Sequence, residues 1–200
     1  MNTIVRCLSL TVALGALMIP ATVSAQDTTA QNDGRLRIDL SGFNEVIGPT
    51  LGAGTLFSTG SGRLTLKINK QIREVAYELT YAFPDAAATP NVGAQFVNQA
   101  HLHVGQRHTT GAIYVWLCQS ADSPAPVVNT PTCPSPSGTV SGRITPSMVL
   151  PVPAQGFPGN EAGFDALLAA MGSGAIYANV HTDRSPAGEI RGQVGHRNDR

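Results

Sequence analysis

The sequence has few charges, and neither sign is in excess: 13 Lys and Arg face 13 Asp and Glu in 200 residues. It therefore offers no basic surface, and we expect no nucleic-acid partner. Long apolar runs are also absent. The longest, Cys7–Ile19, falls short of the ~20 residues that cross a bilayer. We expect no transmembrane segment in the mature chain.

Motifs of the common enzyme classes are missing as well. The sequence contains no GxSxG, no HExxH, no phosphate-binding loop and no GxGxxG after a strand. No spacing singles out a Ser/His/Asp set among the many serines. We therefore assign no catalytic residue and no organic cofactor site, and we favour a non-enzymatic protein over an enzyme.

The N-terminus has the three parts of a secretory signal peptide. Met1–Arg6 carries one positive charge, the apolar run follows, and Val23-Ser24-Ala25 forms an A-x-A-like site. We predict cleavage near Ala25 and export to the periplasm or the outside. A lipoprotein signal is disfavoured because Cys7 precedes the apolar run. Of the rest, residues 26–34 read as a flexible leader and 35–197 as one domain.

Only three cysteines are present, and two of them, Cys118 and Cys133, lie beyond the predicted signal. In an oxidising compartment such a pair predicts a disulfide. Closing a loop of about 15 residues is worth roughly 3 kcal/mol in the chain-entropy model. Metal ligation by the pair is the weaker alternative because there is no CxxC spacing. The enclosed segment is rich in Pro, Ser and Thr.

Short alternating segments dominate the domain and predict strands. They are Arg35–Leu40, a hairpin over Gly62–Tyr81, Ala94–Val104, Ala112–Cys118, Gly138–Ile144, and a second hairpin over Gly174–Gly195. One helix is expected over Glu161–Met171, with Asn160 as its cap and Gly172 at its end. The pattern predicts an all-β fold, an antiparallel sandwich or Greek-key barrel with one short helix.

Three histidines form the candidate site. His101 and His103 share one face of a predicted strand because they are two residues apart, and His181 lies on a later strand. If the two strands are neighbours, the imidazoles converge, and such clusters suit Cu or Zn. His108 is a candidate fourth ligand. The alternative, which we weight more heavily, is structural hydrogen bonding to carbonyls or carboxylates, with Asn179, Asp183 and Glu189 as candidate partners.

Two further pairs have two interpretations each. Glu189 and Arg191 share a face of the last strand, and we interpret them as exposed charges in a cross-strand ion-pair network rather than as ligand-holding groups. Together with Asn179 they are candidates for supporting the site. Trp116 and Tyr114 are expected on one side of their strand, as an exposed aromatic patch or as part of the inner face.

The stretch YANVHTDRSPAGEIRGQVG, residues 177–195, closely resembles the C-terminal signature of the CHRD (chordin-type) domain. AHLHVG, GAIYVWL and the hairpin GSGRLTLKINKQIREVAYELTY resemble its earlier strands. The resemblance implies an exported all-β domain without an established activity. It leaves three hypotheses: a non-enzymatic module for an unknown protein or small ligand, which we favour; a copper or zinc protein with redox chemistry as an option; and a structural surface protein.

Overall fold

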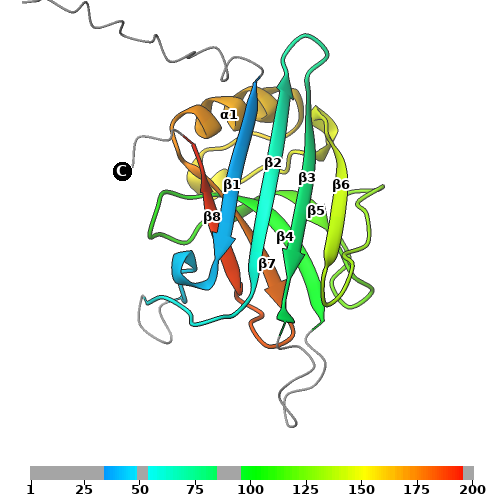
Figure 1. Ribbon diagram of the computed structural model, residues 1–200. Coiled ribbons are helices and arrows are strands. Elements are labelled where there is room, and N and C mark those ends of the chain that lie inside the picture. Colours follow the sequence, from blue (N-terminus) through cyan, green and yellow to red (C-terminus); the bar gives the residue numbers. More distant parts are fainter. Residues whose placement is uncertain (1–33, 49–53, 85–95, 196–200) are drawn as a thin grey trace, which may run out of the picture. The chain divides into compact units, whose positions relative to one another are not determined.

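The computed structural model describes residues 34–48, 54–84 and 96–195 (Figure 1). All of them belong to one of the two compact units of the chain, Gln31–Arg200. The predicted signal peptide and nearly all of the predicted leader lie outside the described residues. Within the described part of the chain, no helix has both the length and the apolar character needed to cross a membrane.

Eight strands form a single sheet in the order β5-β4-β7-β8-β1-β2-β3-β6, and every neighbouring pair is antiparallel. The strands are β1 Arg35–Ser41, β2 Ser61–Asn69, β3 Glu74–Ala82, β4 Val97–Val104, β5 Ala112–Cys118, β6 Gly138–Ile144, β7 Ile176–Thr182 and β8 Ile190–Val194. The outermost strands β5 and β6 contact each other, so the sheet curls into a nearly closed barrel (Figure 1). The predicted fold class is confirmed.

The hairpin of β2 and β3 follows the sequence alternation. Leu64 pairs with Leu79 and Leu66 with Tyr77, and all four side chains are buried in the core. The residues between them alternate toward solvent, as the burial pattern of both strands shows. One apolar face is therefore enough to fix the register of this hairpin.

Strands β4 and β7 differ from this pattern because both of their faces are buried. All seven residues of β7 are buried, as are the last five of β4. Leu102 and Val180 belong to the apolar core, while the histidines face the other way. Segments outside the sheet cover that second face, and these segments turn a polar sheet surface into an enclosed site.

Two register shifts in the β4–β5 ladder correct one sequence expectation. His101 pairs with Trp116 and Leu102 with Val115, but His103 pairs with Ile113. The shifts act as β-bulges and separate Tyr114 from Trp116. Tyr114 packs in the core against Phe157, whereas Trp116 packs on His101 and is 8% exposed. Neither residue forms an exposed patch.

Within the ranges that the structure describes there is one α-helix, α1, which spans Asn160–Gly172 and has Gly159 as its N-cap residue. The expectation that Asn160 caps the helix is wrong, because Asn160 is already its first residue. Phe164, Leu167 and Met171 are buried, as their helical spacing predicts. Arg73, in the turn between β2 and β3, bonds to Glu161 and Asp165, which ties the helix to one end of the barrel (Figure 1).

Among the described residues there are also three short 3-10 helices: η2 Gly42–Asn44, η5 Pro146–Met148 and η6 Pro153–Gln155. The predicted disulfide is confirmed. It joins Cys118, the last residue of β5, to Cys133, and both cysteines are buried.

Candidate metal centre

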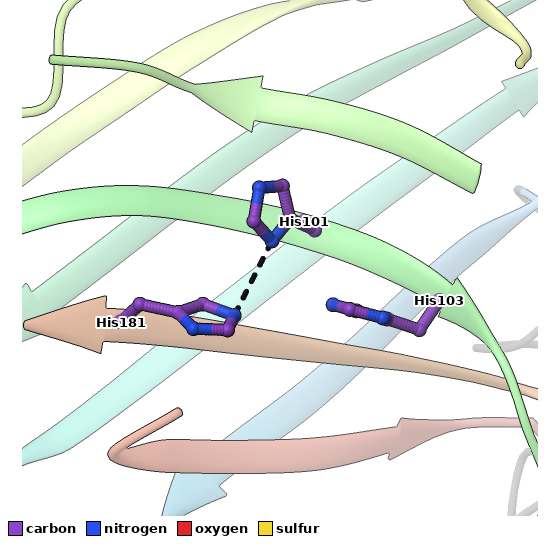
Figure 2. Close-up of side chains that lie close together, drawn as sticks. All are labelled: His101, His103 and His181. Atoms are coloured by element: carbon purple, nitrogen blue, oxygen red, sulfur yellow. Dashed lines mark hydrogen bonds between the residues drawn. The ribbon is translucent and has the colours of Figure 1, made fainter. Parts of the chain in front are cut away.

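The three histidines of the sequence motif converge. Strands β4 and β7 are paired, with Gln99 opposite His181 and His101 opposite Asn179. This register places His101, His103 and His181 on one face, with one ligand atom from each lying within 4.8 Å of the other two (Figure 2). His108 is exposed, with a φ of 64°, and it is not part of this group.

Backbone carbonyls hold two of the rings from behind. His103 Nδ1 lies 2.9 Å from the Gly111 carbonyl oxygen, and His181 Nδ1 lies 2.9 Å from that of Pro186. Because a carbonyl only accepts, each Nδ1 carries the proton and donates it, which leaves the Nε2 lone pair free. Outer partners of this kind orient the imidazole ligands of metal sites.

Two ring nitrogens of these histidines lack partners, and they are placed differently. His101 faces His181 with its Nδ1, so its Nε2 points away from the other two rings (Figure 2). The Nε2 atoms of His101 and His103 are buried and have no hydrogen-bond partner, although buried polar atoms nearly always have one. His101 Nδ1 and His181 Nε2 are 3.3 Å apart (Figure 2). Two nitrogens that bind one tetrahedral ion at about 2.0–2.1 Å are separated by about 3.3 Å. The widest separation in the cluster would have to shorten on binding, by about 1–1.5 Å on the same geometry.

Burial keeps these imidazoles neutral. It lowers the pKa of His103 to about 4, against the hydrogen bond to Gly111, which raises it. Burial also lowers the pKa of His101, with the neighbouring His181 and His103 adding to the effect, and it lowers the pKa of His181. At neutral pH all three rings are therefore uncharged, which is the state in which imidazole binds a metal ion.

Aromatic rings support the cluster from its other sides. The Trp116 ring meets His101 edge-on at a centroid distance of 4.3 Å. Tyr177 stacks on His103 at 4.7 Å with an interplanar angle of 3°. The Arg191 guanidinium carbon lies 3.4 Å from the centroid of the Tyr177 ring, so a guanidinium, a phenol and an imidazole follow one another in a stack.

A polar pair closes the side next to His181. Asn179 Oδ1 lies 3.0 Å from His181 Nε2, and Asn179 Nδ2 donates to Glu45 Oε2 at 3.5 Å. Glu45 is 3% exposed, and burial raises its pKa. Asn179 is thus the one predicted partner that reaches a histidine.

The other predicted partners have different roles. Glu189 accepts hydrogen bonds from Ser58 and Thr182, and Asp183 accepts from the backbone of Phe96 and Arg184. Arg191 donates to the carbonyls of Gln106 and Thr109 and so holds the loop that contributes Gly111. Glu189 and Arg191 are only 1% and 2% exposed, so the expectation of exposed strand charges is wrong.

Glu45 is the residue that sequence reasoning misses altogether. It lies in a segment rich in Gly and Pro, and no periodicity connects it to Asn179, which is 134 positions away. Alternation places Tyr177 on the face of His181, but its stacking on His103 follows from the pairing of β4 with β7. The only available signal for Glu45 is an acidic residue in an otherwise uncharged stretch.

Comparison with known proteins gives one positive result. The family model described as the CHRD domain matches residues 27–194, which include every residue of the cluster and of its surroundings. None of the curated proteins and none of the solved structures compared with the chain matches it.

Proposed function

The chain belongs to the CHRD domain family, and from this premise we propose that it is an exported, non-enzymatic binding module whose ligand is one copper or zinc ion. His101, His103 and His181 are the protein ligands. The observation that carries the proposal is their convergence within 4.8 Å, together with the buried Nε2 of His103, which has no partner. Imidazole nitrogens are preferred ligands of both metals.

The burial of the cluster supports an ion over a macromolecular partner. His101 is 0% exposed, and His103 and His181 are each 6% exposed. A protein partner could not contact these side chains without opening the loop and the turn that cover them. An ion needs only a narrow path, and it would satisfy the unpartnered Nε2 of His103 directly.

The surrounding residues would act as supports for the ligands. Gly111 and Pro186 orient two rings through their carbonyls, and Asn179 offers its amide oxygen beside His181. Arg191 holds the loop over the site, and Glu189 fixes the adjoining turn through Thr182. Such outer partners commonly change metal affinity 10- to 100-fold when they are removed.

Export is a part of the proposal that rests on two features. The N-terminal pattern is that of a signal peptide, and the Cys118–Cys133 disulfide belongs to an oxidising compartment. Periplasmic and external locations both provide such conditions.

Metal content and titration of the purified protein test the proposal. We expect one equivalent of Cu(II) or Zn(II) to bind with a submicromolar Kd, because three oriented nitrogens converge on one point. A variant with His101→Ala, His103→Ala and His181→Ala should lose this binding. His108→Ala is the matched control and should retain it, since His108 is exposed and outside the cluster. Binding that survives in the triple variant would contradict the proposal.

A further inference from the structure

The ligand set brings no negative charge to the site. Among the described residues, the cluster holds three histidines and no carboxylate or thiolate. Neutral imidazoles leave the full charge of a bound ion inside the protein. Zinc sites also normally take four ligands, whereas three nitrogen donors complete the coordination of a monovalent copper ion.

The site is also almost closed to water. The three ligand side chains are between 0% and 6% exposed, and Trp116, which covers His101, is 8% exposed. The free energy needed to bury an ion rises with the square of its charge, so it is about fourfold higher for a divalent ion than for a monovalent ion of the same size. Without anionic ligands, the groups that contact the ion offset little of this difference.

A buried positive charge lies on one side of the cluster. The guanidinium of Arg191, which is 2% exposed, stacks on Tyr177 at 3.4 Å, and Tyr177 stacks on His103 at 4.7 Å. Repulsion between two charges is proportional to each of them, so a divalent ion is disfavoured about twice as strongly as a monovalent one. Screening by salt is weak because the stack is buried.

Buried carboxylates act in the opposite direction. Glu45 lies behind Asn179, where it accepts hydrogen bonds from Asn179 Nδ2 and from the Val46 amide. It is not among the residues whose ligand atoms meet in the cluster. Its charge would favour a divalent ion from a greater distance than a direct ligand. Arg191 and Glu45 are thus tuning residues of opposite sign, and neither is a ligand. A second buried carboxylate, Glu189, accepts hydrogen bonds from Ser58 and Thr182.

From these observations we infer that the centre selects Cu(I) over Cu(II) and Zn(II), through three buried neutral imidazoles beside the stacked guanidinium of Arg191. This inference rests on the proposed function and specifies its metal and oxidation state. It makes Arg191 a positioning and tuning residue that acts through Tyr177, and not a ligand.

The test measures binding of Cu(I), Cu(II) and Zn(II) to the whole chain, with anaerobic chelator competition for Cu(I). Ascorbate keeps the copper reduced and leaves the disulfide intact. The competing thiol of Cys7 is lost on cleavage near Ala25, and Cys7→Ser removes it from the uncleaved chain. We expect the protein to bind Cu(I) at least 100-fold more tightly than Cu(II). A one-electron potential shifts by 59 mV for each tenfold change in the ratio of these affinities. The bound copper should therefore have a reduction potential about 120 mV higher than that of aqueous copper. Zn(II) should bind more weakly than either.

Two substitutions should move this ratio in opposite directions. Arg191→Gln removes the positive charge and should lower the ratio at least fivefold, while Arg191→Lys keeps the charge and should largely preserve it. Glu45→Gln removes the negative charge and should raise the ratio. If a substitution only loosened the structure, it would weaken the binding of Cu(I) and Cu(II) equally and leave the affinity ratio unchanged.

The outcomes separate the metal site itself from its selectivity. If no ion binds, the proposed function fails and this inference fails with it. Equal or tighter binding of Cu(II) or Zn(II) overturns the inference alone and leaves a divalent metal site. A ratio that stays unchanged in Arg191→Gln also overturns it, because the selectivity would then not depend on the stack.

Discussion

Gly188 shows how tightly single residues are fitted beside the histidine cluster. It has a φ of 122°, and a Cβ at this position would lie 2.4 Å from Glu45 Oε2 and 2.8 Å from Asn179 Nδ2. A side chain here would strain the backbone, because the φ angle is positive, and it would also clash with the Glu45 carboxylate. The absence of a side chain is what lets the turn after β7 reach Glu45.

We predict that Gly188→Ala lowers the free energy of unfolding by about 1–3 kcal/mol, the range for a residue forced into a disfavoured backbone region. Chemical denaturation of the metal-free protein measures the change. Gly172→Ala is the control, because Gly172 lies in α1 and a Cβ added there would have no neighbouring atom within 4 Å. It should be neutral or stabilising. Equal stability of Gly188→Ala and the native protein would contradict the close approach.

The three histidines of the cluster could be predicted from the sequence, but their environment could not. The spacing of His101 and His103 fixes their common face, and alternation places His181 with Tyr177. The burial of these rings depends on Glu45, on the turn at Pro186 and on the loop before Gly111, which come from three separate parts of the chain. Local sequence patterns do not predict such long-range contacts. The sequence alone therefore does not decide whether the histidines bind a metal ion or form structural hydrogen bonds.

At the scale of whole elements, strand positions follow from alternation wherever only one face is buried. Strands β2 and β3 are of this kind. Alternation predicts the path of β5 less well, because its register shifts against β4 move Trp116 to the face opposite the core. A bulge inserts one residue and reverses the facing of those that follow, and no residue type in AIYVWLC marks where this happens.

The disulfide is the element-scale feature with the clearest energetic consequence. It joins residues 15 positions apart and fixes a Pro-rich loop to the end of β5. We predict that the Cys118→Ala/Cys133→Ala variant loses about 3 kcal/mol of unfolding free energy, because its unfolded chain is no longer cross-linked. Equilibrium denaturation under non-reducing conditions measures this.

Metal binding provides the control for that variant. The histidines lie on β4 and β7, and neither cysteine belongs to the cluster that their ligand atoms form, so the stoichiometry should remain at one ion for each chain. A reductant should have no effect on the stability of the variant while it destabilises the native protein. A variant as stable as the native protein would mean that the loop is ordered without the cross-link.

On the scale of the whole barrel, three tyrosine hydroxyls join segments that the sheet ladders leave apart. Tyr77 on β3 donates to the carbonyl of Leu117 on β5, and Tyr81 donates to that of Pro134. Tyr114 donates to the carbonyls of Pro158 and Gly163 at the start of α1. The first of these bonds crosses between β3 and the edge strand β5, where the curled sheet nearly closes.

Burial raises the pKa of Tyr77 and of Tyr114 to about 12, and it raises the pKa of Tyr81 as well. Below pH 10 these phenols are neutral in both the folded and the unfolded chain, so they add no pH dependence. Between about pH 10 and 12 the unfolded chain loses the protons while the folded barrel keeps them. Deprotonation then favours the unfolded chain, and stability falls as the pH rises.

We therefore predict that ionisation of the tyrosines lowers the denaturant concentration at the unfolding midpoint as the pH rises from about 10 to 12. Tyr77→Phe separates this effect from other alkaline changes. At pH 7 the variant should be less stable by about 1 kcal/mol, the net value of one hydrogen bond. Above pH 10 its stability should fall less steeply than that of the native protein, so the difference narrows. Parallel curves for the two proteins would show that Tyr77 ionises alike in both states, and the hydroxyl would then not be enclosed at the seam of the barrel.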